Sequence, residues 1–306
     1  MACPVDVTRS AAAPRVAPCD TPPLVINAND SRRGARLLMH PIDPTLIAAL
    51  TSLVSQAGEA ILAIARKPLA VRQKADLSPV TAADEAAQAV ILEGLAKLLP
   101  GVPAVSEELA GPEPAIKARA PFILVDPLDG TKEFIARRDE YTVNLALIEA
   151  GEPALGFVFL PARALLYRGR VGQFAERLAL EAGMPPEAAR AAAPIRVRAA
   201  PSRLVAAVSR SHLDPATEAF LGRLPIAERV ASGSSLKFGL LAEGAADVYP
   251  RLAPTHEWDI AAGHAVLAAA GGTVVRPDGA PLTYGHAETG FLVPAFVAWG
   301  DPHVRQ

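Results

Sequence analysis

The stretch Val-Asp-Pro-Leu-Asp-Gly-Thr-Lys-Glu-Phe, residues 125–134, decides how the rest of the chain is interpreted. A short apolar run before it predicts a buried strand, so Asp126 and Asp129 stand at the strand's carboxyl end, where open α/β sheets commonly bind ligands. Gly130 lacks a side chain, so a backbone N–H can approach an anion closely, and Thr131 adds a hydroxyl. A hard cation or a phosphate oxygen would suit these groups. Asp, Pro and Gly also favour turns, so the stretch alone is equally consistent with a structural corner.

Length and composition restrict the class of protein. The chain has 306 residues, enough for two domains, with 51% hydrophobic residues and a net charge of −2. This predicts a sizeable core and argues against a general nucleic-acid-binding surface. The only cysteines are Cys3 and Cys19, which gives no disulfide framework for a core and favours a reducing, cytoplasmic location. No apolar run reaches the roughly 18 residues of a membrane span, so we expect no integral membrane segment.

The first part of the chain predicts a tail followed by two helices. Residues 1–40 contain five prolines and no apolar period, which indicates a disordered tail. Asp43-Pro44 is typical of a helix start, and apolar residues then follow helical spacing as far as Ile64. A second helix should begin after Thr81-Ala-Ala-Asp84 and stop at Pro100-Gly101.

The middle of the chain predicts a sheet and the end predicts alternating elements. We expect strands at 142–148, 155–160, 164–167 and 195–198. Short connections between these strands suggest antiparallel pairing, while the Ala-rich stretch 176–193 is a short helix or a surface insertion. Further strands are expected at 204–208, near 229, at 247–249 and at 273–275, and helices at 215–224, 234–243 and 258–270. The predicted fold class is therefore α/β, with an α+β first domain at 41–198, built on a largely antiparallel sheet, and an α/β second domain at 199–306.

Four acidic groups are candidates for chemistry, and each has a structural alternative. They are Asp84 at a helix start, Glu107 with Glu108 after a short strand, the pair Asp126 and Asp129, and Asp259 within 254–263. Asp84 could only cap its helix, Glu107 could lie in a solvated loop, and Asp259 could only complement a helix N-terminus.

If these carboxylates converge in one cleft, they cannot all stay ionised without cations. Ligation by carboxylates alone favours a hard divalent ion such as Mg²⁺ over zinc. Two or more such ions could activate a water and neutralise a phosphate leaving oxygen.

An aspartyl-phosphate mechanism is a different chemistry that must be weighed. Phosphatases of that type use Asp-x-Asp-Gly-Thr, whereas Asp126 and Asp129 are three residues apart. In an extended segment a spacing of two places side chains on one face and a spacing of three does not, so this mechanism is disfavoured.

Two strings together carry a resemblance to a known family. Residues 126–131 and 258–263 (Trp-Asp-Ile-Ala-Ala-Gly) resemble the inositol monophosphatase superfamily of Mg²⁺-dependent, lithium-sensitive phosphatases, which implies a layered αβαβα fold. The longer strings at 126–135, 209–212, 233–238 and 242–251 are similar to the CysQ type of 3′(2′),5′-bisphosphate nucleotidase. The resemblance covers about residues 43–298, and 176–193 looks longer than the family's usual connection.

The resemblance implies a set of site residues. The metal positions, for two or three Mg²⁺ ions, match Glu107, Asp126, the Leu128 carbonyl, Asp129 and Asp259. The catalytic positions match Asp84, Thr131 and Glu107, of which Asp84 and Thr131 would orient and deprotonate the attacking water.

The same resemblance implies the substrate contacts. They match Gly130, Thr131, His212, Ser234, Lys237, Arg251 and Asp259. Arg and Lys suit a second phosphate because they supply charged donors. From its helical spacing alone, Lys237 could instead lie on a solvated helix face, and His212 could be an ordinary histidine at a strand end.

The expected function is hydrolysis of the 3′-phosphate of adenosine 3′,5′-bisphosphate, giving AMP and phosphate. The resemblance extends the expected substrates to 3′-phosphoadenylyl sulfate and the role to sulfur assimilation. Alternatives are inositol-1-phosphate or fructose-1,6-bisphosphate hydrolysis on the same fold, and a non-catalytic nucleotide or metal sensor. The expected partner is a small phosphorylated nucleotide and not nucleic acid. The protein is expected to be a cytoplasmic monomer or homodimer, with peripheral association with the inner membrane as an alternative location.

Overall fold

A computed structural model describes residues 42–67, 71–73, 79–109, 116, 119–210 and 213–304. The predicted tail at 1–40 and the candidate residue His212 lie outside these residues. The described helices are α2 (Pro44–Ala65), α3 (Ala82–Leu98), α4 (Thr131–Ile135), α5 (Pro215–Leu221), α6 (Leu236–Ala242) and α7 (Glu257–Ala269).

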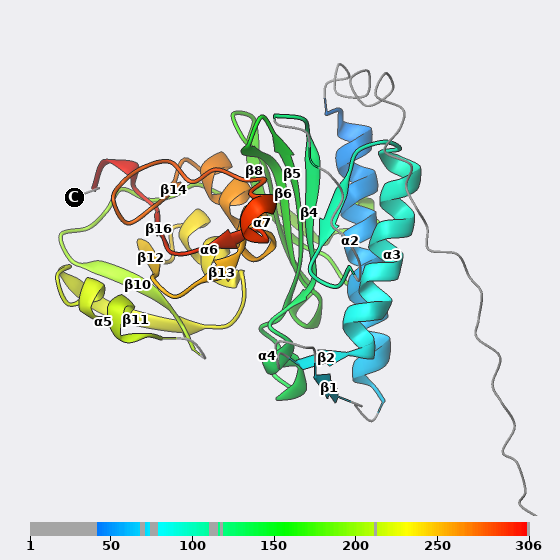
Figure 1. Cartoon of the computed structure of the whole chain (residues 1–306), viewed down its shortest axis with the longest axis horizontal. Helices are drawn as coiled ribbons and strands as arrows, with labels where there is room; N and C mark the ends of the chain where they lie inside the picture. Colours follow the sequence, from blue (N-terminus) through cyan, green and yellow to red (C-terminus); the bar gives the residue numbers. More distant parts are fainter. Residues whose placement is uncertain are drawn as a thin grey trace, which may run out of the picture.

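Local capping explains why the first two helices begin where they do. The Asp43 carboxylate accepts the Leu46 N–H at 2.8 Å, and Pro44 occupies the first position of α2, as predicted. At the start of α3, Thr81 and Asp84 form a reciprocal capping box. Both helices lie side by side on one face of the first sheet, where their apolar residues form one core cluster (Figure 1).

The first sheet has the order β3-β4-β5-β6-β7-β8-β9. Its strands are β3 (Ala104–Ser106), β4 (Phe122–Asp129), β5 (Thr142–Glu149), β6 (Glu152–Leu160), β7 (Leu165–Arg170), β8 (Phe174–Ala179) and β9 (Ala191–Pro194). All neighbours from β4 to β9 are antiparallel, which confirms the predicted pairing, and only β3 runs parallel to its neighbour β4.

Two predictions for this part of the chain need correction. The strand predicted at 195–198 is wrong, because the Val197 N–H bonds to the Ala270 carbonyl at the end of α7 instead of to a strand. The stretch 176–193 contains most of β8 and β9, joined through a 3₁₀ turn at Pro186–Ala188, and so forms the edge of the sheet. The four residues of β9, Ala-Ala-Ala-Pro, are all exposed, so no alternating apolar pattern marked this strand in the sequence.

The second sheet has the order β11-β10-β12-β16-β14. Its strands are β10 (Leu204–Ser209), β11 (Ile226–Ser232), β12 (Val248–Arg251), β14 (Thr273–Val275) and β16 (Phe296–Trp299). β10 is parallel to β11 and β12, while β16 is antiparallel to β12 and β14. Two small pairs complete the described strands: β1 (Val71–Gln73) with β2 (Pro79–Thr81), and β13 (Thr255–His256) with β15 (Leu292–Val293).

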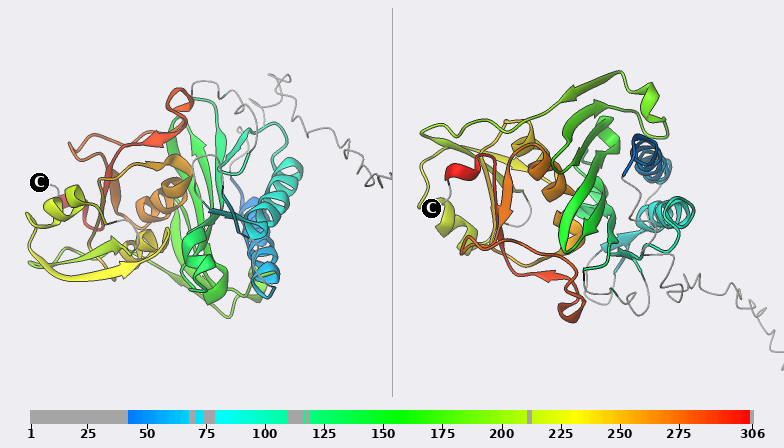
Figure 2. Two further views of the ribbon diagram at one scale, coloured as in Figure 1. Left: turned by 60° about the horizontal axis from the view of Figure 1, so that its bottom comes forward. Right: turned by 90° about the horizontal axis from the view of Figure 1, so that it is seen from above.

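The layers follow the expected αβαβα order. Helices α6 and α7 lie between the two sheets and α5 lies on the outer side of the second sheet (Figures 1 and 2). The largest core cluster fills the space between the sheets, and a smaller cluster lies under α5. Helix α7 approaches β6 very closely, since a Cβ added to Gly156 would come within 2.3 Å of the Ala262 carbonyl oxygen. The predicted division into domains at 198/199 remains a prediction.

Helix α2 is long and apolar enough, by length and composition, to pass a test for a membrane span. Half of the tested window is buried inside the protein, against α3 and the first sheet. A core helix has the same composition, so the packing accounts for the apolar residues of α2.

Candidate active site

A β-bulge brings the two aspartates of the opening motif to one face of β4. Asp126 pairs with Asn144 and Asp129 pairs with Thr142, so β4 advances three residues where β5 advances two. Side chains two apart on β5 share a face, and both aspartates therefore face the same side of the sheet. The period-two argument used above against an aspartyl-phosphate mechanism thus fails for this segment, because its premise of regular extended spacing does not hold.

Asp84 and Thr131 contact each other although they lie far apart in sequence. The Thr131 hydroxyl lies 3.3 Å from Asp84 Oδ1 and 3.3 Å from the Leu128 carbonyl oxygen. Asp84 Oδ2 accepts the Thr81 N–H at 2.8 Å and the Thr81 hydroxyl at 2.7 Å. Burial raises the pKa of Asp84, against the lowering effect of these hydrogen bonds.

Three further carboxylates gather beside this pair. Glu107, Asp126 and Asp259 each offer an oxygen, and these oxygens lie within 4.8 Å of one another. Burial, and then repulsion from Glu107 and other carboxylates, raises the pKa of Asp126 well above its ordinary value. A group of carboxylates without His or Cys has the donor chemistry of a hard divalent cation, which would relieve this repulsion.

Asp129 lies next to this group but turns one oxygen toward hydroxyls. Its Oδ2 accepts from Ser234 Oγ at 2.7 Å and from Ser235 Oγ at 2.9 Å, with Thr142 and Asn144 of β5 also in contact. The Ser235 hydroxyl also lies 2.7 Å from the Asp259 carbonyl oxygen. Ser235 therefore connects Asp129 of the first sheet to the start of α7.

Asp259 is the third residue of α7 and caps it. Its Oδ2 accepts the His256 N–H at 2.9 Å and also contacts the Thr255 hydroxyl. The capping role expected as an alternative is thus present, and the same carboxylate also belongs to the acidic group.

These groups line one pocket of about 280 Å³. Gly130 lines it with φ of +91° at the first turn of α4, a left-handed conformation that other residues adopt at a cost. The candidate residues in the lining are Glu107, Asp126, Leu128, Asp129, Gly130, Thr131, Ser234, Lys237, Arg251 and Asp259. Asp84 contacts Thr131 but is not part of the lining. His212 lies outside the described residues, so the predicted role of His212 stays a prediction.

Two basic side chains, Lys237 and Arg251, also line this pocket. Lys237 is only 2% exposed, so the alternative of a solvated helix face is wrong. Its ammonium bonds to the carbonyls of Ser232 and Ser234 and lies 5.0 Å from the Tyr249 ring centroid. Burial lowers the pKa of Lys237 to about 8. The Nε–H of Arg251 is buried with no hydrogen-bond partner among the described residues, which leaves a charged donor for an anion in the pocket.

Sequence reasoning missed several residues of the lining. His256 and Trp258 stack at 4.7 Å with an interplanar angle of 6°, and both line the pocket. Ser209, Lys132 and Ser235 also line it. The string at 233–238 pointed to Ser235, but the choice between its two adjacent serines needed the fold.

Comparison with known proteins is consistent with this site. A family profile described as "Inositol monophosphatase family" matches residues 43–300. A 3′(2′),5′-bisphosphate nucleotidase CysQ of Escherichia coli (strain K12) is 46% identical over 249 residues, which cover 80% of this chain and 95% of that protein. The protein of the same name from Salmonella typhimurium is 44% identical over 256 residues, covering 82% and 98%.

A solved structure is similar to this chain and comes from the same family. The crystal structure of CysQ from Bacteroides thetaiotaomicron, described as a bacterial member of the inositol monophosphatase family, superposes with a TM-score of 0.69 at 35% identity. It covers 86% of this chain and 98% of that chain. With the family profile spanning most of the chain and relatives of this identity over nearly their whole length, this chain belongs to the inositol monophosphatase family.

Proposed function

We propose that this protein is a Mg²⁺-dependent phosphomonoesterase that removes the 3′-phosphate of adenosine 3′,5′-bisphosphate, giving AMP and phosphate. The observation that carries the proposal is one pocket lined both by carboxylates and by two basic side chains, the buried Lys237 and the partly buried Arg251. Such a pocket suits a substrate with one phosphate to be cleaved and a second to be recognised. Relatives named as 3′(2′),5′-bisphosphate nucleotidases support the choice of substrate.

The carboxylate group would hold the metal. Glu107, Asp126, Asp129, Asp259 and the Leu128 carbonyl are the proposed ligands, for two or three Mg²⁺ ions. When bound, the metal would supply Lewis-acid activation of water and neutralise phosphate charge. The acid-only donor set and the raised pKa of Asp126 fit a hard cation.

The chain's own residues would then orient the reactants. Asp84 Oδ1 would accept a hydrogen bond from the Thr131 hydroxyl. The oxygen of that hydroxyl would then be free to accept a hydrogen bond from the attacking water and hold it in place. Backbone N–H groups of Gly130 and Thr131 would bind the scissile phosphate, since the left-handed turn at Gly130 leaves no side chain over them.

The second phosphate would lie against the basic side chains. Arg251 offers its unpartnered Nε–H, and Ser234 and Lys237 lie beside it in the lining. We include His212 in this proposal as a base or ribose contact. Hydrolysis of 3′-phosphoadenylyl sulfate, a cytoplasmic location and a monomer or homodimer belong to the same proposal.

The deciding experiment measures phosphate release from three substrates side by side, with and without Mg²⁺. We expect adenosine 3′,5′-bisphosphate to be turned over faster than inositol-1-phosphate or fructose-1,6-bisphosphate, and the activity to vanish with a chelator. Arg251→Lys serves as the matched variant, because it keeps the charge but removes the Nε–H. It should raise KM for the bisphosphate and leave KM for a nucleoside monophosphate nearly unchanged. Faster hydrolysis of inositol-1-phosphate by the unmodified protein would overturn the choice of substrate.

A further inference from the structure

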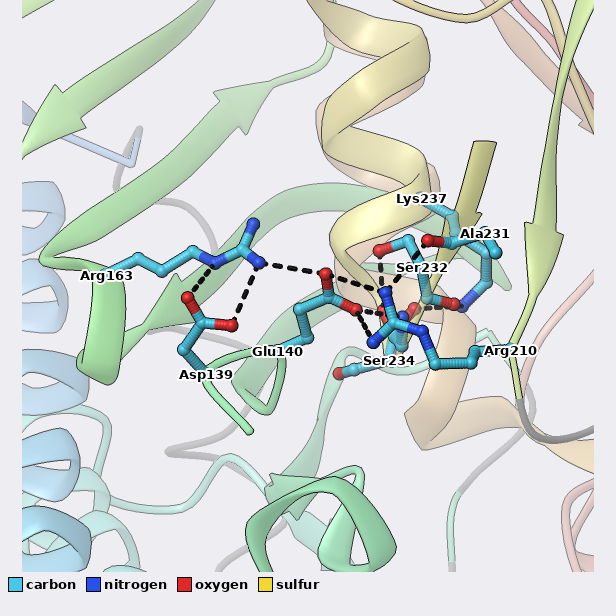
Figure 3. Close-up of polar contacts among 9 residues, drawn as sticks. Asp139, Glu140, Arg163, Arg210, Ala231, Ser232, Ser234 and Lys237 are labelled. Carbon is cyan, nitrogen blue, oxygen red and sulfur yellow. Dashed lines mark hydrogen bonds and ion pairs between the residues drawn. The ribbon is translucent and has the colours of Figure 1, made fainter. Parts of the chain in front are cut away.

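Glu140 lies at a junction of charged groups outside the pocket lining. It lies two residues before β5 and is 8% exposed. Its Oε2 accepts the Gly233 N–H at 2.8 Å. The Arg210 guanidinium contacts both of its oxygens, at 2.5 Å to Oε2 and 3.1 Å to Oε1, and also donates to the Ala231 carbonyl at 3.0 Å (Figure 3).

A second guanidinium holds Glu140 from the first sheet. Arg163, in the 3₁₀ turn Pro161–Arg163 after β6, donates to Glu140 Oε1 at 2.9 Å. The same Arg163 binds Asp139 through two hydrogen bonds of 3.0 Å each (Figure 3). Glu140 therefore lies between an arginine from the first sheet and an arginine that follows β10 of the second sheet.

The main chain of Glu140 also lies between two glycine turns of the site. A Cβ added to Gly233 would come within 2.9 Å of the Glu140 carbonyl oxygen, and one added to Gly130 within 3.4 Å of the same atom. Residue 140 thus touches both the turn that is proposed to hold the scissile phosphate and the turn that begins the segment 233–235.

That segment controls how Asp129 is held. Ser234 has φ of +53°, an uncommon conformation for a residue with a side chain, so the surroundings must hold it in place. From this conformation Ser234 and Ser235 donate to Asp129 Oδ2. The chain of contacts runs from Glu140 through the Gly233 N–H to the two serines and then to Asp129.

Glu140 is suited to this task because it stays charged. Burial would raise its pKa, but hydrogen bonds from Arg210 and from the Gly233 N–H outweigh burial and lower it. A carboxylate accepts from all three donors at once, while an amide would place an N–H₂ against donors that need an acceptor.

We propose that Glu140 is a positioning residue, which fixes the segment 233–235 across the junction of the two sheets and thereby sets the orientation of Asp129. Its effect on turnover rests on the function proposed above, but its effect on the segment does not. Groups that orient a metal's ligands commonly change metal affinity or activity by about 10–100-fold when they are removed.

The test compares Glu140→Gln with Asp139→Asn. Both changes remove one carboxylate charge that contacts Arg163, but only Glu140 contacts Arg210 and Gly233. In Glu140→Gln we expect faster hydrogen–deuterium exchange in peptides covering 229–238 without added metal. We also expect roughly tenfold weaker Mg²⁺ binding by calorimetry, with a rise in the Mg²⁺ concentration needed for half-maximal turnover. Asp139→Asn should match the unmodified protein in all three measurements.

Arg210→Lys is the second variant, in case Glu140→Gln folds poorly. Lys keeps the charge but cannot contact both carboxylate oxygens and the Ala231 carbonyl at once, so it should show the same changes in smaller size. Unchanged exchange at 229–238 in both variants, or equal losses in Asp139→Asn, would overturn the proposal. If the unmodified protein does not hydrolyse the bisphosphate, the proposed function fails, and the exchange and calorimetry results still decide the role of Glu140.

Discussion

Single carboxylates in this protein serve the fold and the site together. Asp84 caps α3 with one oxygen and faces the Thr131 hydroxyl with the other. Asp259 caps α7 and also belongs to the acidic group. The alternatives weighed from the sequence, cap or functional group, are therefore not exclusive. A residue that caps a helix is held in one place by that cap, which suits a residue whose position matters for chemistry.

The proposed role of Thr131 can be tested by separating its hydroxyl from its shape. Thr131→Val keeps the branched side chain but removes the group that contacts Asp84, so we expect turnover to fall by about 10²–10⁴-fold. The midpoint of thermal unfolding should change little, because Thr131 is only half-buried. Thr131→Ser, which keeps the hydroxyl, is the control and should retain most of the activity. Equal turnover in the Val variant would remove Thr131 and Asp84 from the proposed water-orienting pair.

At the scale of elements, the sequence predicted the helices and strands that are stabilised by residues close to one another in the chain. Helices α2 and α3 were predicted because an N-cap and an apolar period lie in the same short window. The strand β16 was missed, since its four residues are stabilised by pairing with β12 and β14 from elsewhere in the chain. The contacts of Glu140 with Arg210 span 70 residues and leave no trace in either local sequence.

The close approach of α7 to β6 gives a test at this scale. Gly156→Ala would place a Cβ within 2.3 Å of the Ala262 carbonyl oxygen and 2.7 Å of Ala265 Cβ, so α7 must move away from the sheet. We expect a loss of about 1–3 kcal/mol in the free energy of unfolding, measured by denaturant titration. Because Asp259 is in the first turn of α7, Mg²⁺ binding should also weaken.

Gly222→Ala is the matched control for this change. Its added Cβ would meet only ordinary contacts, 3.5 Å or longer, at a residue with φ of −62°. Its stability and Mg²⁺ affinity should equal those of the unmodified protein. Equal stability of the Gly156 variant would show that the gap between α7 and β6 can widen freely.

At the scale of the whole molecule, the site exists only because two sheets meet. Asp126 and Asp129 come from the first sheet, whereas Ser234 follows β11 of the second and Asp259 begins the helix between them. The sequence predicted the layers and the family, since the two motifs at 126–131 and 258–263 are compact strings. The convergence of these motifs came from the family resemblance, because no spacing rule relates residues more than a hundred positions apart. The metal, its ion count and the substrate contacts remain proposals.

The core between the sheets contains a histidine that makes stability depend on pH. His264 of α7 shares a hydrogen bond of 2.8 Å with the Tyr284 hydroxyl, and burial lowers its pKa to about 4. In the unfolded chain it would titrate near pH 6.5, so below that pH the unfolded state binds a proton that the folded state does not. This effect is absent above pH 6.5 and costs about 3 kcal/mol of stability once the pH has fallen to 4.

His264→Gln isolates this contribution, because other buried acids also titrate in this range. The variant keeps a hydrogen-bonding side chain but cannot be protonated, so its stability should fall less steeply than that of the unmodified protein between pH 6.5 and 4. Urea titrations at several pH values would measure the difference. His303→Gln, at an exposed histidine, is the control and should leave the slope unchanged. Parallel slopes for all three proteins would contradict the assignment.

The bulge in β4 decides which way the two aspartates of the opening motif face. Leu124 and Asp126 face α7, Leu128 faces α2 and α3, and the extra residue returns Asp129 to the side of Asp126. If β4 kept three residues from Asp126 to Asp129 but paired regularly with β5, Asp129 would turn toward the apolar layer under α2 and α3. Loss of one residue between the two aspartates would instead remove the bulge and leave a spacing of two, which keeps both carboxylates on one face. Two acids three apart on a bulged strand and two acids two apart on a regular strand therefore present their carboxylates in the same direction, and the bulge, not the residue count alone, distinguishes the two cases.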